Sequence, residues 1–411
     1  MRKNKRKKVQ LFLMVLSICF CTIPVSGAGK EDEPENLYAL SATLIDGESG
    51  RILYEKNGSE KRPMASTTKI MTCILTLEDG CLDEVAEVSQ YAAKMPKVHL
   101  GAAVGEKFYV KDLLYSLMLE SHNDSAVILA EHVGESVEKF ADKMNEKAKE
   151  IGCKDTWFIT PNGLDAKEER DGEERSHETT ANDLAQIMRY CIQQSPAKEQ
   201  FIEITGTPSY SFWDAEGKRE FSCHNHNAFL SMMDGALSGK TGFTAKAGYC
   251  YVGAVRKEGK TLIVALLGCG WPNNKGYKWS DTKKLMEYGL EKYELHSFNE
   301  IEFSQYPKKI SVRGGQNKEL GQNPEISLFR KKGEEKKILL RDDEKVDVSY
   351  HGKKSLSAPV KKGEKAGELI YKVDGEIWYK EQVLANENME KIDFPWCLKQ
   401  VVKRYGKVEK N

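Results

Sequence analysis

Apolar residues along this chain follow two different periods, and the change of period divides the chain into regions. Residues 39–45 and 52–54 flank a turn rich in Gly and acidic residues, which predicts a β-hairpin. Residues 249–255 and 261–267 are almost continuously apolar and flank a polar turn, which predicts a second, longer hairpin. Such runs are typical of strands at the centre of a sheet that helices cover.

Between the two hairpins, apolar residues recur at helical spacing. A helix is expected to begin at or just before Ser66, and the polar stretch 80–105 is expected to be irregular and on the surface. Strands, a helical middle and strands again predict an α+β fold with the sheet and the helices segregated. The remaining predicted helices are at 110–120, 125–133, 136–151, 179–194 and about 282–293.

The composition changes after residue 296. Short alternating segments with Lys and Gly turns predict a small all-β domain at 297–383, following a first domain at 36–296. Residues 384–411 form a tail that contains an amphipathic helix. Such a helix suits the headgroup region of an anionic membrane, and a helix docked on the β domain is the alternative. The residues on its apolar face are Phe394, Cys397, Leu398, Val401, Val402 and Tyr405.

The first 27 residues have the parts of a signal peptide. Six basic residues precede an apolar core at 11–23, and small residues follow at 25–28. Export with loss of residues 1–27 is therefore expected, although an uncleaved anchor also fits this segment. The whole chain has 62 basic and 62 acidic residues, and without residues 1–27 it has 56 against 62. Because basic and acidic residues are interspersed, no nucleic-acid partner is expected.

The stretch from Pro63 to Ile70 carries the candidate chemistry. Residues three apart share a helix face, so Lys69 can place its amine beside the Ser66 hydroxyl. A lysine kept neutral by burial and nearby positive charge can take the proton of a serine and make it a nucleophile. The pattern Ser-x-x-Lys occurs four times in the chain, so it needs support from other motifs.

Two further motifs follow Ser66 in order. Ser121-His122-Asn123 provides Ser-x-Asn, and Lys240-Thr241-Gly242 is the single Lys-Thr-Gly in the chain. The ordered set resembles the penicillin-recognising serine enzymes. The surrounding residues narrow the resemblance to D-alanyl-D-alanine carboxypeptidases, the low-molecular-mass penicillin-binding proteins, over about residues 36–296. The segments that carry it are 65–69, 123–126, 160–164, 177–181 and 240–244.

This resemblance implies both a fold and a function. The fold would be a penicillin-binding/β-lactamase-like catalytic domain followed by the small β domain, which has no chemistry of its own. The function would be removal of the terminal D-alanine from peptidoglycan stem pentapeptides, without a cofactor or a metal. β-Lactam antibiotics would be covalent inhibitors. The enzyme would work on the extracytoplasmic face of the bacterial membrane or in the cell wall, held to the membrane surface by its tail.

The resemblance also assigns roles to the residues that would carry out the reaction. Ser66 would be the acylated nucleophile, and Lys69 would deprotonate it directly or through a neighbour. Ser121 would relay the proton to the leaving amine. Asn123 would hold either the substrate amide or the Lys69 amine.

The third motif would bind the substrate. Lys240 would add positive charge that lowers the pKa of the neighbouring amine and attracts the substrate carboxylate, and Thr241 would hydrogen-bond that carboxylate. Gly242 would let the strand lie close to the substrate. The backbone N–H groups of Ser66 and Phe243 would form the oxyanion hole.

Some nearby features fit the resemblance less directly. His122 occupies a position that is often Gly or Ala in this family, and we favour packing at the cleft rim over tuning of the cleft by titration. Residues 223–226, Cys-His-Asn-His, lack a second pair of metal ligands, so we expect a strand next to that of Lys240. Lys275 and Lys278 are candidates for a cationic partner of the terminal carboxylate.

Three rival functions are considered. A serine β-lactamase would share the motifs, but we find no persuasive segment of Glu followed by Leu-Asn that would supply a deacylation base. A non-catalytic peptidoglycan-binding protein on the same fold would not need an intact Ser66, Lys69, Ser121 and Lys240. A glutaminase of similar fold would lack the signal peptide and the β domain.

Overall fold

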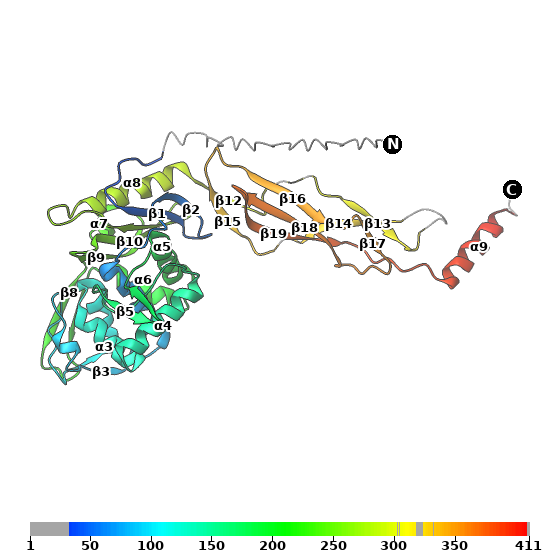
Figure 1. Ribbon diagram of the computed structural model, residues 1–411. Helices are drawn as coiled ribbons and strands as arrows, with labels where there is room; N and C mark the ends of the chain where they lie inside the picture. The colour runs from blue at the N-terminus through cyan, green and yellow to red at the C-terminus, as the bar shows by residue number, and fades with distance from the viewer. Residues whose placement is uncertain (1–32, 302, 304, 318–323, 332, 409–411) are drawn as a thin grey trace, which may run out of the picture. The chain divides into compact units, whose positions relative to one another are not determined.

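The computed structural model describes residues 33–301, 303, 305–317, 324–331 and 333–408, so the predicted signal peptide lies outside the described residues. The first domain is built on a five-stranded antiparallel sheet (Figure 1). Both predicted hairpins are confirmed as neighbouring strands of this sheet. Its strand order is β2 (Ile52–Lys56), β1 (Ser41–Asp46), β11 (Lys260–Leu267), β10 (Gly248–Lys257) and β9 (Ala236–Thr244).

Both faces of this sheet are covered, because consecutive residues of a strand point to opposite sides. In β10, Tyr251 and Val255 pack in the core cluster that contains the residues of α8 (Tyr277–Lys292). Val252 and Ala254 pack in the larger cluster with the helices of the other face. The predicted central position of β10 and β11 is therefore confirmed, and it explains why both strands are apolar throughout.

The helices that cover the face with the larger core cluster lie between β2 and β9 in the sequence, as predicted. The helix after Ser66 is confirmed, but the serine lies in a 3₁₀ turn that precedes the α-helix. The elements are η1 (Ala65–Thr68), α1 (Lys69–Asp79), η2 (Ala92–Lys94), α2 (Val110–Tyr115), the π-helix η3 (Ser116–Glu120), α3 (Asn123–Gly134), α4 (Val137–Ile151), α5 (Ala181–Arg189), the π-helix η4 (Tyr190–Gln194) and α6 (Lys198–Gly206). The short helix α7 (Phe229–Met232) belongs to the other face, because Phe229 packs in the cluster that contains the residues of α8.

Three predictions about this domain need correction. Residues 80–105 are not simply irregular and exposed, because they contain a short strand and η2, and they bury Ala86 and Val88. Residues 223–226 do not pair with the strand of Lys240, because the strand there forms a local hairpin with its sequence neighbour. Helix α8 begins five residues earlier than predicted. The short hairpins are β3 (Val85–Glu87) with β4 (Lys107–Tyr109), β5 (Lys167–Arg170) with β6 (Glu173–Ser176), and β7 (Ser209–Trp213) with β8 (Glu220–His224).

The second domain is all-β, as predicted, and has its own core cluster. Alternate residues of its long strands, such as Leu369, Tyr371 and Val373, point into that core. The main sheet has the order β16 (Val346–Gly352), β18 (Lys365–Val373), β19 (Glu376–Ala385), β14 (Glu325–Lys331), β13 (Lys309–Arg313) and β17 (Ser355–Ser357), and β12 (Glu294–Ser297) pairs with β15 (Lys337–Leu340).

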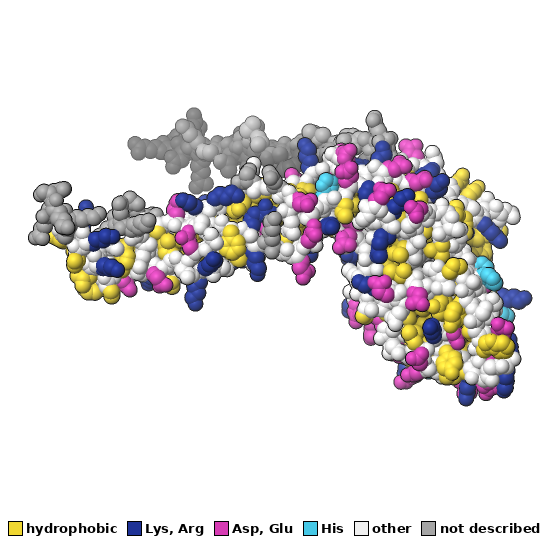
Figure 2. Space-filling view, turned by 180° about the vertical axis from the view of Figure 1, so that it is seen from behind, with side chains coloured by type: hydrophobic (Ala, Val, Ile, Leu, Met, Phe, Trp, Pro, Cys, Tyr) yellow, Lys and Arg dark blue, Asp and Glu magenta, His cyan; other side chains and the backbone are white. Residues whose placement is uncertain are grey.

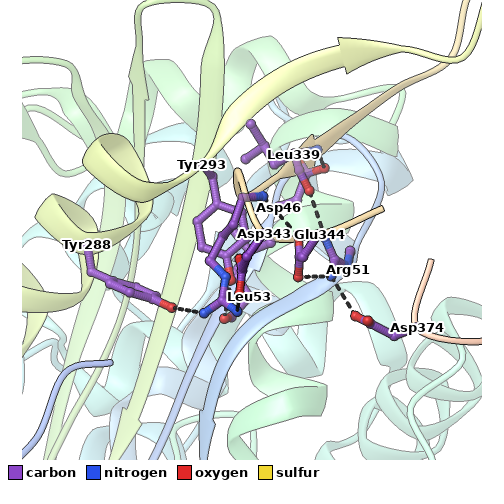
Figure 3. A network of polar contacts seen from close by, with 10 residues as sticks. Asp46, Arg51, Leu53, Tyr288, Tyr293, Leu339, Asp343, Glu344 and Asp374 are labelled. Atoms are coloured by element: carbon purple, nitrogen blue, oxygen red, sulfur yellow. Dashed lines mark hydrogen bonds and ion pairs between the residues drawn. The ribbon is translucent and has the colours of Figure 1, made fainter. Parts of the chain in front are cut away.

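Strand β15 and a buried arginine connect the two cores. Ile338 and Leu340 pack in the core of the β domain, whereas Leu339 packs in the cluster between the five-stranded sheet and α8. Arg51, immediately before β2, donates to Leu339 O at 2.9 Å and to Glu344 Oε2 at 2.8 Å (Figure 3). The Arg51 and Glu344 side chains are only 7% and 10% exposed. This ion pair therefore replaces hydration that both charges lose on folding.

The tail contains the predicted amphipathic helix, α9 (Phe394–Val408), which begins after Asp393. Asp393 Oδ1 accepts the N–H of Trp396 at 2.9 Å, as an N-terminal cap does. Large apolar side chains on this helix are exposed, with Phe394 at 78% and Val402 at 63%. Within the described part of the chain, none of the helices combines the length and the apolar character that a membrane crossing requires.

Replacing Arg51 by Ala should leave the Glu344 carboxylate buried without its guanidinium partner. Loss of one partner of a buried ion pair costs about 3–5 kcal/mol, and we expect the free energy of unfolding to fall by that amount. The control is Lys61→Ala, which removes an exposed ion pair with Asp155 and should cost at most about 1 kcal/mol. Denaturant unfolding of both variants measures the difference, and equal losses would contradict the importance of the buried pair.

Candidate active site

The turn that presents Ser66 is fixed by a chain of hydrogen bonds from outside it. Ala65 has a φ of +48°, which is uncommon for a residue with a Cβ. Thr68 Oγ1 donates to Ala65 O at 2.9 Å and lies 2.8 Å from Nε2 of His177. His177 Nδ1 accepts the N–H of Ile159 at 2.9 Å, so Nε2 carries the ring proton. Burial lowers the pKa of His177 to about 3, which keeps this ring neutral.

Gly163 supports the same turn by close backbone contact. It has a φ of +85°, and a Cβ at this position would lie 2.0 Å from Ala65 O. The loop before Gly163 therefore packs directly on the Ser66 turn. This contact also places Asn162 O within reach of the Lys69 amine.

The Lys69 amine is completely buried among three oxygen atoms. Its Nζ lies 2.9 Å from Ser66 Oγ, 3.0 Å from Asn123 Oδ1 and 2.6 Å from Asn162 O. The two Asn oxygens can only accept hydrogen bonds, and a neutral amine has two N–H groups and one lone pair. A neutral Lys69 therefore donates to both Asn oxygens and leaves its lone pair for the Ser66 hydroxyl.

Electrostatics favour this neutral form of Lys69. Burial lowers the pKa of its amine well below the ordinary value, and the positive charge of Lys240 lowers it further, while Asp124 opposes the shift. Burial also lowers the pKa of Lys240, to about 7. The two buried lysines thus differ in role, because the amine of Lys69 contacts Ser66 and that of Lys240 contacts Ser121.

Ser121 joins the second motif, to which it belongs, to the third. Lys240 Nζ donates to Ser121 Oγ at 3.0 Å and to Thr241 O at 2.9 Å. Asn123 is the first residue of α3, and its Nδ2 donates to Pro96 O at 3.1 Å, which orients Oδ1 toward Lys69. The structure therefore brings the predicted motif residues together around Ser66.

Strand β9 lies at the edge of the sheet, and its pairing decides where the Phe243 N–H points. Phe243 lies opposite Tyr249, which uses its own N–H and C=O on the other side, with the N–H to Gly270 O at 2.9 Å. Phe243 and Tyr249 are therefore a non-hydrogen-bonded pair, and the Phe243 N–H points to the free edge of β9. A Cβ at Gly242 would lie 2.9 Å from Ser66 N, so this edge runs alongside the nucleophile.

Sequence reasoning missed the contributions of Asn162 and His177. Both stand in segments that carried the family resemblance, but neither had been given a role. Asn162 acts through its backbone carbonyl, which no side-chain pattern reveals, and His177 acts through Thr68. The signal that could have found them is the Pro-x-Gly turn around Asn162 and a histidine placed just before a capped helix.

Lys278, one of the two candidates for a cationic partner of the terminal carboxylate, has its amine over two aromatic rings. Lys278 Nζ donates to Lys275 O at 2.8 Å and lies over the rings of Tyr249 and Trp279, at 4.7 and 4.6 Å from their centres. The Tyr249 ring also packs against that of Phe243, with 4.6 Å between the ring centres. Among the described residues, no cluster of His, Cys, Asp and Glu is arranged to hold a metal ion.

Comparison with known proteins identifies the family of this site. The sequence family described as D-alanyl-D-alanine carboxypeptidase matches residues 28–270, which is more than half of the chain. The chain belongs to the D-alanyl-D-alanine carboxypeptidase family. Residues 291–391 match the family described as the C-terminal domain of penicillin-binding protein 5. The resemblance drawn from the motifs is thereby confirmed.

Individual relatives agree with this assignment to the carboxypeptidases. D-alanyl-D-alanine carboxypeptidase DacF of Bacillus subtilis (strain 168) is 31% identical, covering 95% of this chain and 97% of the relative. Penicillin-binding protein 5 of Haemophilus influenzae has the same fold, with a TM-score of 0.65 over 87% of this chain and 99% of that one, at 24% identity. Penicillin-binding protein D2 of Listeria monocytogenes, solved in an ampicillin-bound form, is 30% identical with a TM-score of 0.54, over 63% of this chain and 100% of that one.

We expect Gly163→Ala to disrupt the Ser66 turn of this carboxypeptidase. The added Cβ meets backbone atoms, which cannot move aside as a side chain can, so the free energy of unfolding should fall by roughly 3 kcal/mol or more. The control is Gly172→Ala, with a φ of +78° and open space around it, which should cost only about 1–2 kcal/mol. If thermal unfolding shows the same loss for both variants, backbone conformation alone matters and the contact with Ala65 does not.

Proposed function

We propose that this serine-type D-Ala-D-Ala carboxypeptidase removes the terminal D-alanine of peptidoglycan stem peptides by acylating Ser66, with Lys69 as the base. The observation that carries the proposal is the buried Lys69 amine, 2.9 Å from Ser66 Oγ and held by two oxygens that can only accept. A hydroxyl beside a desolvated neutral amine can lose its proton as it attacks a carbonyl carbon.

The reaction begins with attack by Ser66 on the peptide and ends with hydrolysis of the acyl-enzyme. A bond forms between Ser66 Oγ and the carbonyl carbon of the penultimate D-alanine, while the Ser66 proton passes to Lys69. The carbonyl oxygen becomes negative and is stabilised by the N–H groups of Ser66 and Phe243. The C–N bond to the terminal D-alanine breaks as Ser121 delivers its proton to the leaving nitrogen. The proton that Lys69 accepted from Ser66 then passes to Ser121, so that Ser121 regains its hydroxyl and Lys69 its neutral amine. Water later hydrolyses the ester and restores the Ser66 hydroxyl.

Substrate recognition rests on the edge of β9. Lys240 in its charged form attracts the terminal carboxylate, and the Thr241 hydroxyl donates to it. Gly242 lets β9 lie directly against the Ser66 turn, so that an extended peptide paired with the free edge of β9 can reach the nucleophile. A β-lactam presents a strained amide and a carboxylate to the same groups. Its acyl-enzyme on Ser66 would accumulate, which accounts for inhibition.

The rival functions receive less support. A β-lactamase would not require the second domain, which matches that of penicillin-binding protein 5 over residues 291–391. A non-catalytic wall-binding protein has no use for a lysine buried beside a serine, because burial of an amine costs stability. We therefore keep the carboxypeptidase as the function of this chain.

Attachment to the extracytoplasmic membrane surface through α9 completes the proposal. The exposed apolar residues Phe394, Leu398, Val402 and Tyr405 share one side of the helix, and lysines occupy the others. Each such side chain contributes about 1.5–3 kcal/mol when buried, so a few of them give reversible binding. The catalytic domain would then work at the inner edge of the wall, after export directed by residues 1–27.

Ser66→Ala should abolish both release of D-alanine from a peptide ending in D-Ala-D-Ala and covalent labelling by fluorescent penicillin. The matched control is Ser280→Ala, which alters an exposed serine of another Ser-x-x-Lys pattern and should retain full activity. Labelling that persists in a folded Ser66→Ala variant would place the nucleophile elsewhere.

The pKa of Lys240, about 7, predicts a dependence of substrate binding on pH. Lys240 is charged below this pKa and loses its charge as the pH rises through it, so the KM for the peptide should rise by up to about tenfold per pH unit above 7. The arginine of Lys240→Arg stays charged throughout this range. This variant should bind the peptide more weakly, with a higher KM that does not change with pH. A parallel rise of KM in both enzymes would show that another group controls binding.

Deletion of residues 393–411 should release the protein from anionic vesicles and leave its carboxypeptidase activity unchanged. Leu398→Glu, on the exposed apolar side of α9, should weaken vesicle binding by roughly tenfold or more, since it removes apolar burial and adds a negative charge. The control Gln400→Glu adds the same charge off that side and should bind nearly as the unaltered protein does. Continued sedimentation of the truncated protein with vesicles would place the membrane contact in another segment.

A further inference from the structure

Ser121 is held in a strained backbone conformation. Its φ is +66°, in the left-handed region that a serine rarely adopts, directly after the π-helix η3 and before α3. Strain of this kind costs about 1–3 kcal/mol and persists only where surrounding contacts enforce it. The residues on either side of Ser121 make such contacts, and they reach two different parts of the domain.

His122, which follows Ser121, is tied to the helices on both sides of the turn. Its Nδ1 lies 2.8 Å from Ser116 Oγ, at the start of η3. Ser116 Oγ in turn lies 2.7 Å from Ser125 Oγ, in the first turn of α3. Ser116 and Ser125 are completely buried, so their hydroxyls have no water to bond instead. The imidazole is therefore part of a hydrogen-bonded chain that joins η3 to the first turn of α3.

Glu120, which precedes Ser121, is hydrogen-bonded to the last residue of β8 and to the segment that follows it. Glu120 Oε1 accepts the backbone N–H of His224 at 2.7 Å, and Oε2 lies 2.7 Å from Nε2 of His226. Burial opposes ionisation of this carboxyl, but the bonds from His224 and His226 outweigh it and hold the Glu120 pKa below its ordinary value. The segment is itself fixed, because Asn225 Nδ2 donates to two carbonyls at the end of α6.

We propose that Glu120 and His122 are positioning residues for the carboxypeptidase reaction: together they hold Ser121 in its left-handed conformation, with its hydroxyl on Lys240. If either Glu120 or His122 lost its contacts, the Ser121 turn would relax toward an ordinary conformation. Ser121 Oγ would then leave its position 3.0 Å from Lys240 Nζ. This proposal rests on the proposed role of Ser121 in delivering a proton to the leaving amine. It gives His122 a function that packing at the cleft rim does not include.

An alanine variant and a conservative variant at each of the two positions test the positioning role. His122→Ala and Glu120→Ala should each lower kcat for a D-Ala-D-Ala peptide by about ten- to a hundredfold with little change in KM, since a displacement near 1 Å costs up to about a hundredfold. His122→Asn keeps a polar atom where Nδ1 stands, and Glu120→Gln keeps an acceptor for His224 N–H. Both should restore most of the rate. His132→Ala, on the helix α3 that follows His122, removes a histidine paired with Glu84 and is the control, whose kcat should be unchanged.

A double-mutant cycle separates positioning from general loss of structure. In a Ser121→Ala background, His122→Ala should change kcat by less than about twofold, because the hydroxyl that it positions is already absent. A loss as large as in the parent enzyme would overturn the proposal, as would unaltered kcat in both alanine variants. If Ser121→Ala itself keeps full activity, the proposed proton relay fails, independently of what anchors the turn.

Ser116→Ala tests the same anchor if His122→Ala does not fold. It removes the hydroxyl that His122 contacts and leaves the imidazole in place, so its kcat should fall as far as that of His122→Ala. A Ser116→Ala enzyme with full kcat would overturn the role of His122.

Discussion

The burial of one amine is the constraint on which the rest of this site depends. An ammonium in the interior is costly, so the Lys69 side chain is stable there chiefly as a neutral amine. The oxygens of Asn123 and Asn162 use its two N–H groups and leave the lone pair facing Ser66. The same dry surroundings lower the pKa of Lys240, which remains available to meet a carboxylate. Two identical side chain types thus become a base and a binding group because their partners differ.

Close backbone packing is what keeps water away from that amine. Glycine at 163 and 242 lets a loop and a strand edge approach the Ser66 turn to distances that a Cβ would forbid. Ala65 and Ser121 adopt positive φ values in the same region. Strain in a backbone is retained where a function needs it. Here it is offset by hydrogen bonds of His177 with Thr68, of Ser116 with His122, and of the His224 N–H with Glu120.

Much of the fold could be predicted from the sequence, because burial on both faces leaves continuous apolar strands and burial on one face leaves helical spacing. The contact of Ser66 with Lys69 followed from spacing alone. The approach of Ser121 and Lys240 required family resemblance, since residues 119 positions apart meet only through tertiary structure. Asn162 could not be found from its side chain, because its backbone carbonyl makes the contact. The partner of β8 was mispredicted because a local hairpin with β7 competes with pairing to β9, and loop closure favours the local partner.

Lys69 is a neutral base in the free enzyme, and this property can be measured by titrating its amine. The side-chain resonances of lysine can be followed against pH by NMR in protein with isotope-labelled lysine, with Lys69→Ala to assign the signal. We expect the Lys69 amine to titrate well below the ordinary lysine pKa of about 10.4. A Lys69 amine that stays protonated up to about that pH would contradict the account, because a charged ammonium beside Ser66 cannot accept its proton.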